Sequence, residues 1–197
     1  MQFPINLNLE GRRCLVVGGG RIANRKAAGL AACGALVTVV APEITDELAA
    51  LATEVRRRPY AQGDLEGHWL VITATADRTV DQAVYDDAEA AGIWANSADD
   101  PDRCSFTLAA VVRRGPVMIT ASTGGVSPAL SSWLRARLTE AIGPEFADIA
   151  AELAERRADV HARGESTEDL DWGPVIDEIV AAHRRSDTIT LTAPVPS

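Results

Sequence analysis

The sequence predicts an α/β protein in which a doubly wound parallel sheet is followed by a β-hairpin, a helix and a small C-terminal helical domain. Over roughly the first hundred residues, short apolar runs alternate with segments of helical periodicity, the pattern of a parallel sheet covered by helices. A glycine-rich turn joins the first apolar run to the first helix. Two β-like runs and then only helical segments follow. We therefore expect domains at 1–112, 113–143 and 144–187 and a disordered tail at 188–197.

The glycine-rich turn has the spacing of a dinucleotide-binding site. An apolar run at 14–17 precedes it, and Gly18, Gly20 and Ala23 fit the pattern G-x-G-x-x-G/A. One glycine permits the turn, one lets the backbone approach a pyrophosphate, and the small residue packs the helix on the strand, while free N–H groups face the phosphates. A glycine turn that binds nothing is the alternative. A second buried strand at 36–40 completes a βαβ unit and favours a Rossmann-type binding domain.

The position that usually recognises the cofactor ribose is altered. A Rossmann strand that binds NAD commonly ends in Asp or Glu, but here Val40 is followed by Ala41, Pro42 and Glu43. Glu43 lies a few residues late and could still reach the 2′-OH, whereas Arg21 could face a 2′-phosphate. The sequence favours NAD over NADP.

The remaining elements of the sheet domain follow from periodicity and helix-capping residues. We expect helices at 21–32, 45–53 and 78–91, the last closed by Gly92, and strands at 54–60, 69–75 and 93–96. Because ligands bind at the carboxyl ends of parallel strands, we expect Thr75 and the polar loop after Asn96 at the ligand edge.

The second half of the chain begins with a predicted antiparallel hairpin, with strands at 105–112 and 116–122. Ser127 as N-cap and Pro128 at the first helical position predict a helix that runs through Ile142. Two more helices are expected, at 145–161 and 174–185.

Composition narrows the class of protein. The net charge is −9, and residues 140–187 carry 13 acidic and 5 basic side chains, so no basic stripe is present and nucleic-acid binding is not expected. Three distant cysteines predict neither a disulfide framework nor a zinc site, and three histidines without ligand spacing predict surface residues rather than a tight metal site. We find no apolar run of membrane-spanning length and no signal peptide, and expect a cytoplasmic protein with no membrane partner.

Several segments together resemble one family. The first is CLVVGGGRIANRKA at 14–27, preceded by Pro4-Ile5 and Leu9; the others are 69–75, 96–101 with Cys104-Ser105-Phe106, Arg114-Gly115-Pro116 and 122–129. In order and spacing they resemble the precorrin-2 dehydrogenase and sirohydrochlorin ferrochelatase family, the module that forms the N-terminal part of siroheme synthase. The resemblance covers roughly residues 1–142, and the acidic C-terminal third around Trp172 departs from it.

This resemblance implies a reaction and its residues. It implies NAD-dependent oxidation of precorrin-2 to sirohydrochlorin, in many members insertion of Fe²⁺ to give siroheme, and a homodimer built through the hairpin and the helix after Ser127. The family's catalytic carboxylate falls on Asp99, and its nucleotide-binding positions fall on Arg21, Ile22, Pro42 and Glu43. Thr123 stands where one branch of the family carries a modified serine.

The chemistry suits these residue types. Precorrin-2 is a polycarboxylate, so its site should offer cations and backbone N–H groups, and we expect these from Arg103, Ser122, Thr123, Gly124 and Gly125. Oxidation also needs a base near the hydride acceptor, and Asp99 could serve both in this step and in removing pyrrole protons for iron insertion. A cap or Asx-turn in the Asp-Asp-Pro loop is the structural alternative for Asp99, and Asp100 and Asp102 are competing candidates.

Two other functions remain open at this point. The chain could be a dehydrogenase that leaves iron insertion to another protein. It could instead be an NAD-sensing module without turnover, although Asp99 and the loop at 122–129 would have no evident role in a sensor.

Overall fold

The computed structural model describes residues 2–168 and 170–190, which form parts of two compact units, Met1–Leu108 and Ala109–Ser197. Each unit is described by itself below. The division falls before the predicted boundary at 112/113, because both strands of the hairpin pair with each other inside the second unit.

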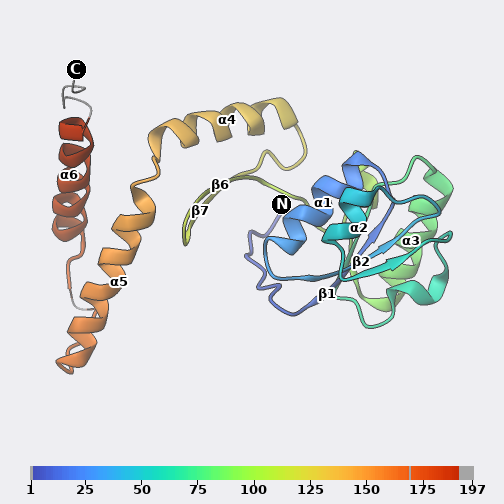
Figure 1. Cartoon of the computed structure of the whole chain (residues 1–197), viewed down its shortest axis with the longest axis horizontal. Helices are drawn as coiled ribbons and strands as arrows, with labels where there is room; N and C mark the ends of the chain where they lie inside the picture. The colour runs from blue at the N-terminus through green and yellow to red at the C-terminus, as the bar shows by residue number, and fades with distance from the viewer. Residues whose placement is uncertain (1, 169, 191–197) are drawn as a thin grey trace, which may run out of the picture. The chain divides into compact units, whose positions relative to one another are not determined.

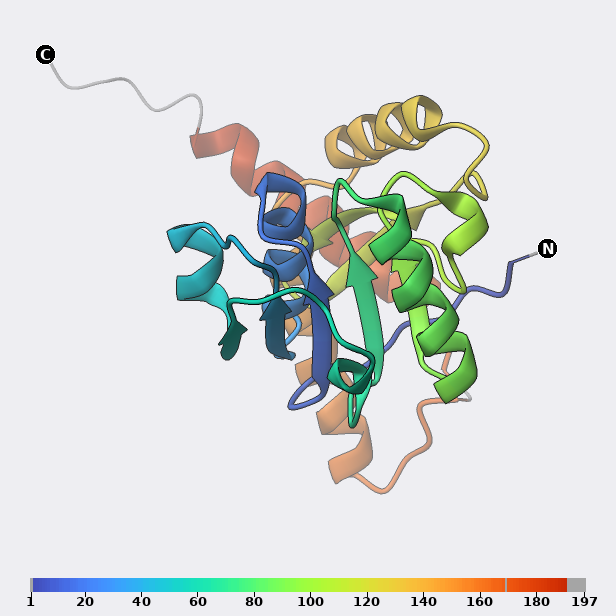
Figure 2. The same cartoon turned by 90° about the vertical axis from the view of Figure 1, so that its right-hand side faces the viewer.

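The first unit is a five-stranded parallel sheet with the strand order β3-β2-β1-β4-β5 (Figure 1). Figure 2 shows β1 and β4 side by side, at the point where the strand order reverses. The strands are β1 (Arg13–Val17), β2 (Leu36–Val40), β3 (Glu54–Arg56), β4 (Leu70–Thr73) and β5 (Trp94–Ser97). The helices are α1 (Arg21–Ala31), α2 (Asp46–Leu51) and α3 (Arg78–Ala91), with the 3₁₀ turns η1 (Gln62–Leu65) and η2 (Pro101–Arg103).

Helices cover both faces of this sheet, as the sequence predicts. On one face, Val16 and Ile72 pack in a cluster with Ala23, Ala27 and other residues of α1 and α2. On the opposite face, Leu15 and Val71 form a second cluster with Val84 and Ala88 of α3. Strands buried on both faces are apolar at every position rather than at alternate ones, which is why β1 and β2 read as continuous apolar runs.

Short-range hydrogen bonds define the helix ends of the first unit, and the predicted closure of α3 by Gly92 is confirmed. The Thr45 hydroxyl accepts a hydrogen bond from the N–H of Leu48 (3.4 Å), and Asp77 caps α3 by accepting from Thr79 (2.8 Å). Gly92 has a φ of +66° and closes α3. These local interactions fix helix ends without help from the rest of the fold.

Three predicted strands are shorter in the structure. β3 ends at Arg56, before Pro59, which has no N–H for a sheet. β4 covers 70–73 of the predicted 69–75. The first hairpin strand starts at residue 110 instead of 105, because Ser105 is tied to β5, where its hydroxyl accepts from the N–H of Ala95 at 2.7 Å.

The second unit contains the hairpin of β6 (Ala110–Arg114) and β7 (Val117–Ala121), followed by α4 (Pro128–Ala141), α5 (Phe146–Ala162) and α6 (Gly173–Thr190). Ser127 caps α4, accepting from the N–H of Leu130 at 3.2 Å. Arg114 holds the other end of α4 by donating to the carbonyl oxygens of Ile142 (2.9 Å) and Thr139 (3.1 Å). Of the predicted tail, residues 188–190 continue α6 and residues 191–197 lie outside the described residues.

His68 is a correction to the expected surface histidines. Its side chain is buried at the start of β4, and its Nε2 lies 3.2 Å from the Thr38 hydroxyl. Burial, and then the charge of Arg13, lower the pKa of His68. The sequence placed it in a polar stretch, Glu66-Gly67-His68, in which the first two residues are exposed, and only tertiary packing beside Thr38 of β2 buries the ring.

A buried carboxylate anchors the segment after β3. Asp64 is 3% exposed and accepts from Arg56 (2.8 Å), from Arg58 (2.7 Å) and from the N–H of Ala61 (2.9 Å). The hydrogen bond from Arg58, followed in weight by the N–H of Ala61 and by Arg56, outweighs burial and lowers the pKa of Asp64 to about 2. The ionised carboxylate therefore stabilises the folded state.

We expect Asp64→Asn to lower the free energy of unfolding at neutral pH by about 1–3 kcal/mol, because two guanidinium groups lose their ionised partner. In the wild-type protein this contribution is present above the ordinary carboxyl pKa near 3.8 and is lost as the pH falls toward 2. Urea unfolding at pH 7 and pH 3 measures both effects. The exposed Glu89→Gln is the control, and equal stability of the two variants at pH 7 would contradict the assignment.

Candidate active site

The predicted cofactor residues of the first unit all follow carboxyl ends of parallel strands. Gly18–Ala23 follow β1, Pro42 and Glu43 follow β2, Thr75 follows β4 and Asp99 follows β5. The strand order reverses between β1 and β4, and ligands of open α/β sheets bind in the crevice at this point. The topology thus brings these residues to one edge.

The three glycines of the turn have different tasks. Gly18 has a φ of +128°, and a Cβ there would overlap the carbonyl oxygen of Ala74. A Cβ on Gly19 would overlap the carbonyl oxygen of Glu43. Around Gly20 nothing lies within 4 Å of the Cβ position. The first two glycines let neighbouring loops pack closely, and Gly20 is the one that faces open space.

The start of α1 fits a dinucleotide phosphate. Gly20 is its N-cap and supplies no side-chain hydrogen bond, so the first N–H groups of the helix have no capping partner. Ala23 is fully buried and brings the helix close to the sheet. Arg21 and Ile22 are exposed beside the turn. Backbone donors, a helix dipole and open space above Gly20 are the features that pyrophosphate binding requires.

The residues expected at the cofactor ribose lie beside the glycine turn, and Thr75 is hydrogen-bonded to α3. Pro42 and Glu43 are exposed, and the loop that contains them is joined to the glycine turn by a hydrogen bond from the N–H of Thr45 to the carbonyl of Gly19 (3.1 Å). Glu43 therefore lies next to the turn. The Thr75 hydroxyl donates to Asp81 (2.7 Å) and fastens the end of β4 to α3.

Asp99 has an unusual backbone. Its φ of +64° is the only positive value at a non-glycine residue in the described part of the chain. The turn is closed by a hydrogen bond from the N–H of Asp100 to the carbonyl of Ser97 (3.4 Å). Asp tolerates this left-handed conformation better than most residues, and such conformations concentrate at functional sites.

The Asp99 side chain is exposed and makes no hydrogen bond or ion pair within the described residues. It therefore caps nothing in this structure, and the alternative of a structural cap has no hydrogen bond to support it. A carboxylate held on a tight turn and left without a partner is available to a ligand or a proton.

Arg103, expected to contact substrate, is engaged within the fold. Its Nε donates to Gln82 of α3 (2.7 Å), and its Nη1 forms an ion pair with Asp100, which also lies 3.7 Å from Arg78. These contacts fasten η2 to α3. Asp100 is therefore a structural residue of the loop, unlike its neighbour Asp99.

Asn96 and Cys104 support the same loop and were missed as site residues. The buried Asn96 amide donates to the Cys104 sulfur (3.4 Å) and to the carbonyl of Phe106 (2.9 Å). The Cys104 thiol lies near the carbonyl oxygens of Ser97 (3.4 Å) and Asp100 (3.2 Å), and burial raises its pKa. A polar Asn at the end of a predicted strand was the available signal.

The other four expected substrate residues belong to the second unit. Gly124 and Gly125 have φ values of +64° and +86°, so the loop depends on glycine at both. The Ser122 hydroxyl accepts from Gly124 (3.2 Å). The Thr123 hydroxyl accepts from the N–H of Ser127 (3.1 Å) and lies 3.1 Å from the Ser131 hydroxyl. The loop is thus prefolded at the start of α4.

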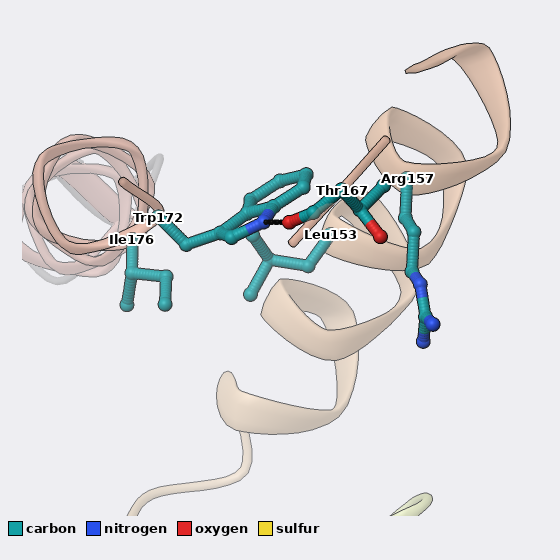
Figure 3. A pocket seen from close by; sticks show the side chains of 5 residues that line it. All are labelled: Leu153, Arg157, Thr167, Trp172 and Ile176. Carbon is teal, nitrogen blue, oxygen red and sulfur yellow. Dashed lines mark hydrogen bonds between the residues drawn. The ribbon is translucent and has the colours of Figure 1, made fainter. Parts of the chain in front are cut away.

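A pocket of about 360 Å³ lies between α5 and α6 in the second unit. Figure 3 shows Leu153 and Arg157 on α5 and Ile176 on α6, with Trp172 between them. The Trp172 indole donates to the carbonyl of Thr167 at 3.0 Å, which holds the ring in place. Trp172 thus packs between the two helices.

A parallel sheet with this strand order, carrying a glycine turn and an uncapped helix start at its switch point, defines a dinucleotide-binding protein. The chain belongs to the NAD(P)-binding family NAD_binding_7, whose model matches residues 5–110. No described helix is both long and apolar enough to cross a membrane. Nor do the described residues include a group of three His, Cys, Asp or Glu side chains that could hold a metal ion.

Relatives extend the similarity beyond this domain. Siroheme synthase 1 of Aeromonas salmonicida is 41% identical over 165 residues, which cover 82% of this chain and 35% of that protein. Siroheme synthase of Azotobacter vinelandii is 39% identical over 193 residues, which cover 91% of this chain and 41% of the relative. The chain therefore spans about two fifths of the length of these relatives.

A solved structure matches most of the chain. SirC, precorrin-2 dehydrogenase, has a TM-score of 0.71 at 25% identity, covering 93% of this chain and 100% of that one. The resemblance predicted from the sequence motifs is confirmed by both comparisons. So is the predicted fold, including the hairpin and helices that follow the sheet.

The different tasks of Gly19 and Gly20 can be separated by substitution. We expect Gly20→Ala to change the free energy of unfolding by less than about 0.5 kcal/mol, since Ala accepts this backbone and meets no atom, but to weaken NAD binding about tenfold or more. Gly19→Ala should instead destabilise the fold by about 1–3 kcal/mol through overlap with the backbone of Glu43. Thermal unfolding and calorimetric titration with NAD measure the two quantities. Unchanged NAD affinity in Gly20→Ala would remove the turn from the cofactor site.

Proposed function

We propose that the chain oxidises precorrin-2 to sirohydrochlorin with NAD as the hydride acceptor. The observation that carries this proposal is the unpaired Asp99 carboxylate at the same sheet edge as the dinucleotide turn. Membership of an NAD(P)-binding family and the match to SirC over nearly the whole of both chains support it. The siroheme synthases among the relatives point to the same pathway.

Different residues serve cofactor binding, proton transfer and substrate binding in this reaction. NAD, when bound, accepts a hydride, that is two electrons and one proton, from the substrate. We assign the pyrophosphate to the N–H groups at the start of α1 and the open backbone at Gly20, and the ribose hydroxyls to Glu43. The Asp99 carboxylate accepts the second proton that the substrate loses on oxidation, so the substrate loses one hydride and one proton in all. We assign the substrate carboxylates to the glycine loop at 122–125 of the second unit.

Asp99→Asn tests the catalytic assignment. Asn tolerates the left-handed backbone at this turn and has nearly the same shape, so the fold should persist while the proton acceptor is lost. We expect kcat for anaerobic, NAD-dependent oxidation of precorrin-2, followed by absorbance, to fall about 100-fold or more, with NAD affinity unchanged. Asp102→Asn is the matched control in the same loop.

Other outcomes discriminate between functions. If wild-type protein gives no change with NAD or with NADP, the enzyme assignment is wrong and an NAD-sensing module takes its place. If Asp99→Asn oxidises at the wild-type rate, another residue is the base. Fe²⁺ added after oxidation is complete distinguishes a dehydrogenase alone from a protein that also forms siroheme faster than a protein-free control.

We further propose that the chain forms a homodimer through α4. No residue of α4 is buried in the single chain, although the helix carries large apolar side chains. Leu130 is 47% and Trp133 is 57% exposed, and contiguous apolar surface of this kind marks association sites.

Trp133→Asp should therefore shift the protein from dimer to monomer at micromolar concentration, because a charge replaces the largest apolar side chain of the interface. Light scattering coupled to gel filtration measures the mass. Arg135→Asp, two residues along the same helix, points to a different side and should leave the dimer intact. A wild-type monomer, or a Trp133→Asp dimer, would contradict this interface.

A further inference from the structure

Arg57 is the middle one of three consecutive arginines at the carboxyl end of β3. Its neighbours Arg56 and Arg58 both donate to the buried carboxylate of Asp64. Arg57 forms no ion pair within the described residues, and its Nη1 instead donates to the carbonyl oxygen of Ile44 at 2.8 Å. Arg57 therefore has a different task from its neighbours, and this task concerns the loop between β2 and α2.

The β2–α2 loop, residues 41–45, contains Glu43 and is held by two separate parts of the chain. The glycine turn makes the first contact, because the N–H of Thr45 donates to the carbonyl of Gly19 at 3.1 Å and Gly19 packs directly on the backbone of Glu43. The segment after β3 makes the second contact, through the hydrogen bond from Arg57 to the Ile44 carbonyl. Both contacts are to backbone atoms within one residue of Glu43.

The Glu43 side chain has no anchor of its own. It is exposed, as is Pro42 before it, and it makes no hydrogen bond or ion pair within the described residues. The next side chain, Ile44, is buried in the cluster that joins α1 and α2 to the sheet. The direction in which the Glu43 carboxylate leaves the loop therefore depends on how the backbone at 43–44 is held. A charged donor such as Arg57 holds a carbonyl oxygen more strongly than a neutral one.

We propose that Arg57 is a positioning residue for NAD. By holding the Ile44 carbonyl, it orients the β2–α2 loop so that the Glu43 carboxylate meets the ribose hydroxyls. Arg57 acts through this loop and does not itself touch the cofactor. The inference rests on the assignment of the ribose to Glu43 in the proposed function, but it concerns cofactor binding and can be tested without the oxidation of precorrin-2.

Calorimetric titration with NAD, at a temperature where every variant is folded, tests the proposal. We expect Arg57→Met, which keeps the length of the side chain but has no donor, to weaken NAD binding about tenfold. Arg57→Lys keeps a cationic donor and should bind NAD within about threefold of wild type. Arg13→Met is the matched control and should bind NAD like wild type, because Arg13 is an exposed arginine of the same unit at the amino end of β1, the opposite end of the sheet.

A double-mutant cycle shows whether Arg57 acts through Glu43. We expect Glu43→Ala alone to weaken NAD binding about tenfold, because the ribose hydroxyls lose their acceptor. Adding Arg57→Met to this variant should weaken binding by less than about twofold more, since the loop no longer carries the ribose ligand. Independent losses that multiply to about 100-fold in the double variant would overturn the proposal.

Other outcomes would also overturn the proposal. A loss of affinity that disappears in about 1 M salt would mean that Arg57 only attracts the anionic cofactor. A lower unfolding temperature of Arg57→Met with unchanged NAD affinity would mean a merely structural role.

The failure of this inference and that of the proposed function are distinguishable. If the variants bind NAD as expected but the wild-type protein does not oxidise precorrin-2, the inference stands and the proposed function is wrong. Oxidation by a protein whose NAD affinity ignores Arg57→Met would mean the reverse.

Discussion

Close approach of backbone to backbone at the carboxyl edge of the sheet is the constraint on which the site depends. The turn after β1 touches the loop after β2 at Glu43 and the loop after β4 at Ala74. Both contacts exist only because Gly18 and Gly19 lack a Cβ. This packing leaves Gly20 and the first N–H groups of α1 facing open space, so the same turn joins three strand ends and presents a phosphate site.

The loop after β5, at the fourth strand end, is held in place by side chains rather than by close packing at glycines. Asn96, Cys104 and the ion pair of Asp100 with Arg103 fix the loop after β5, and Asp99 takes a left-handed conformation at its tip. The neighbouring side chains of Asn96, Asp100, Arg103 and Cys104 are thereby engaged, while the Asp99 carboxylate is not. Such an arrangement stores modest backbone strain at the one residue proposed to handle a proton, and the surrounding contacts maintain it.

The two units use their helices differently. In the first, α1 and α3 bury a narrow stripe against the sheet, as their apolar spacing predicts. In the second, α4 has a strong N-cap and proline start but buries none of its residues. Local signals therefore predict where α4 begins and ends, but Leu130 and Trp133 stay exposed in the single chain, in keeping with the proposed dimer.

The sequence by itself determined the element order, the N-cap at Ser127, the end of α3 at Gly92 and the dinucleotide turn, because these depend on residues close together in the chain. Family motifs added Asp99, whose role no periodicity could reveal. Only the tertiary structure decided that Arg103 is engaged by Gln82 and that His68 is buried. Each of these joins residues far apart in sequence, and packing alone selects such partners.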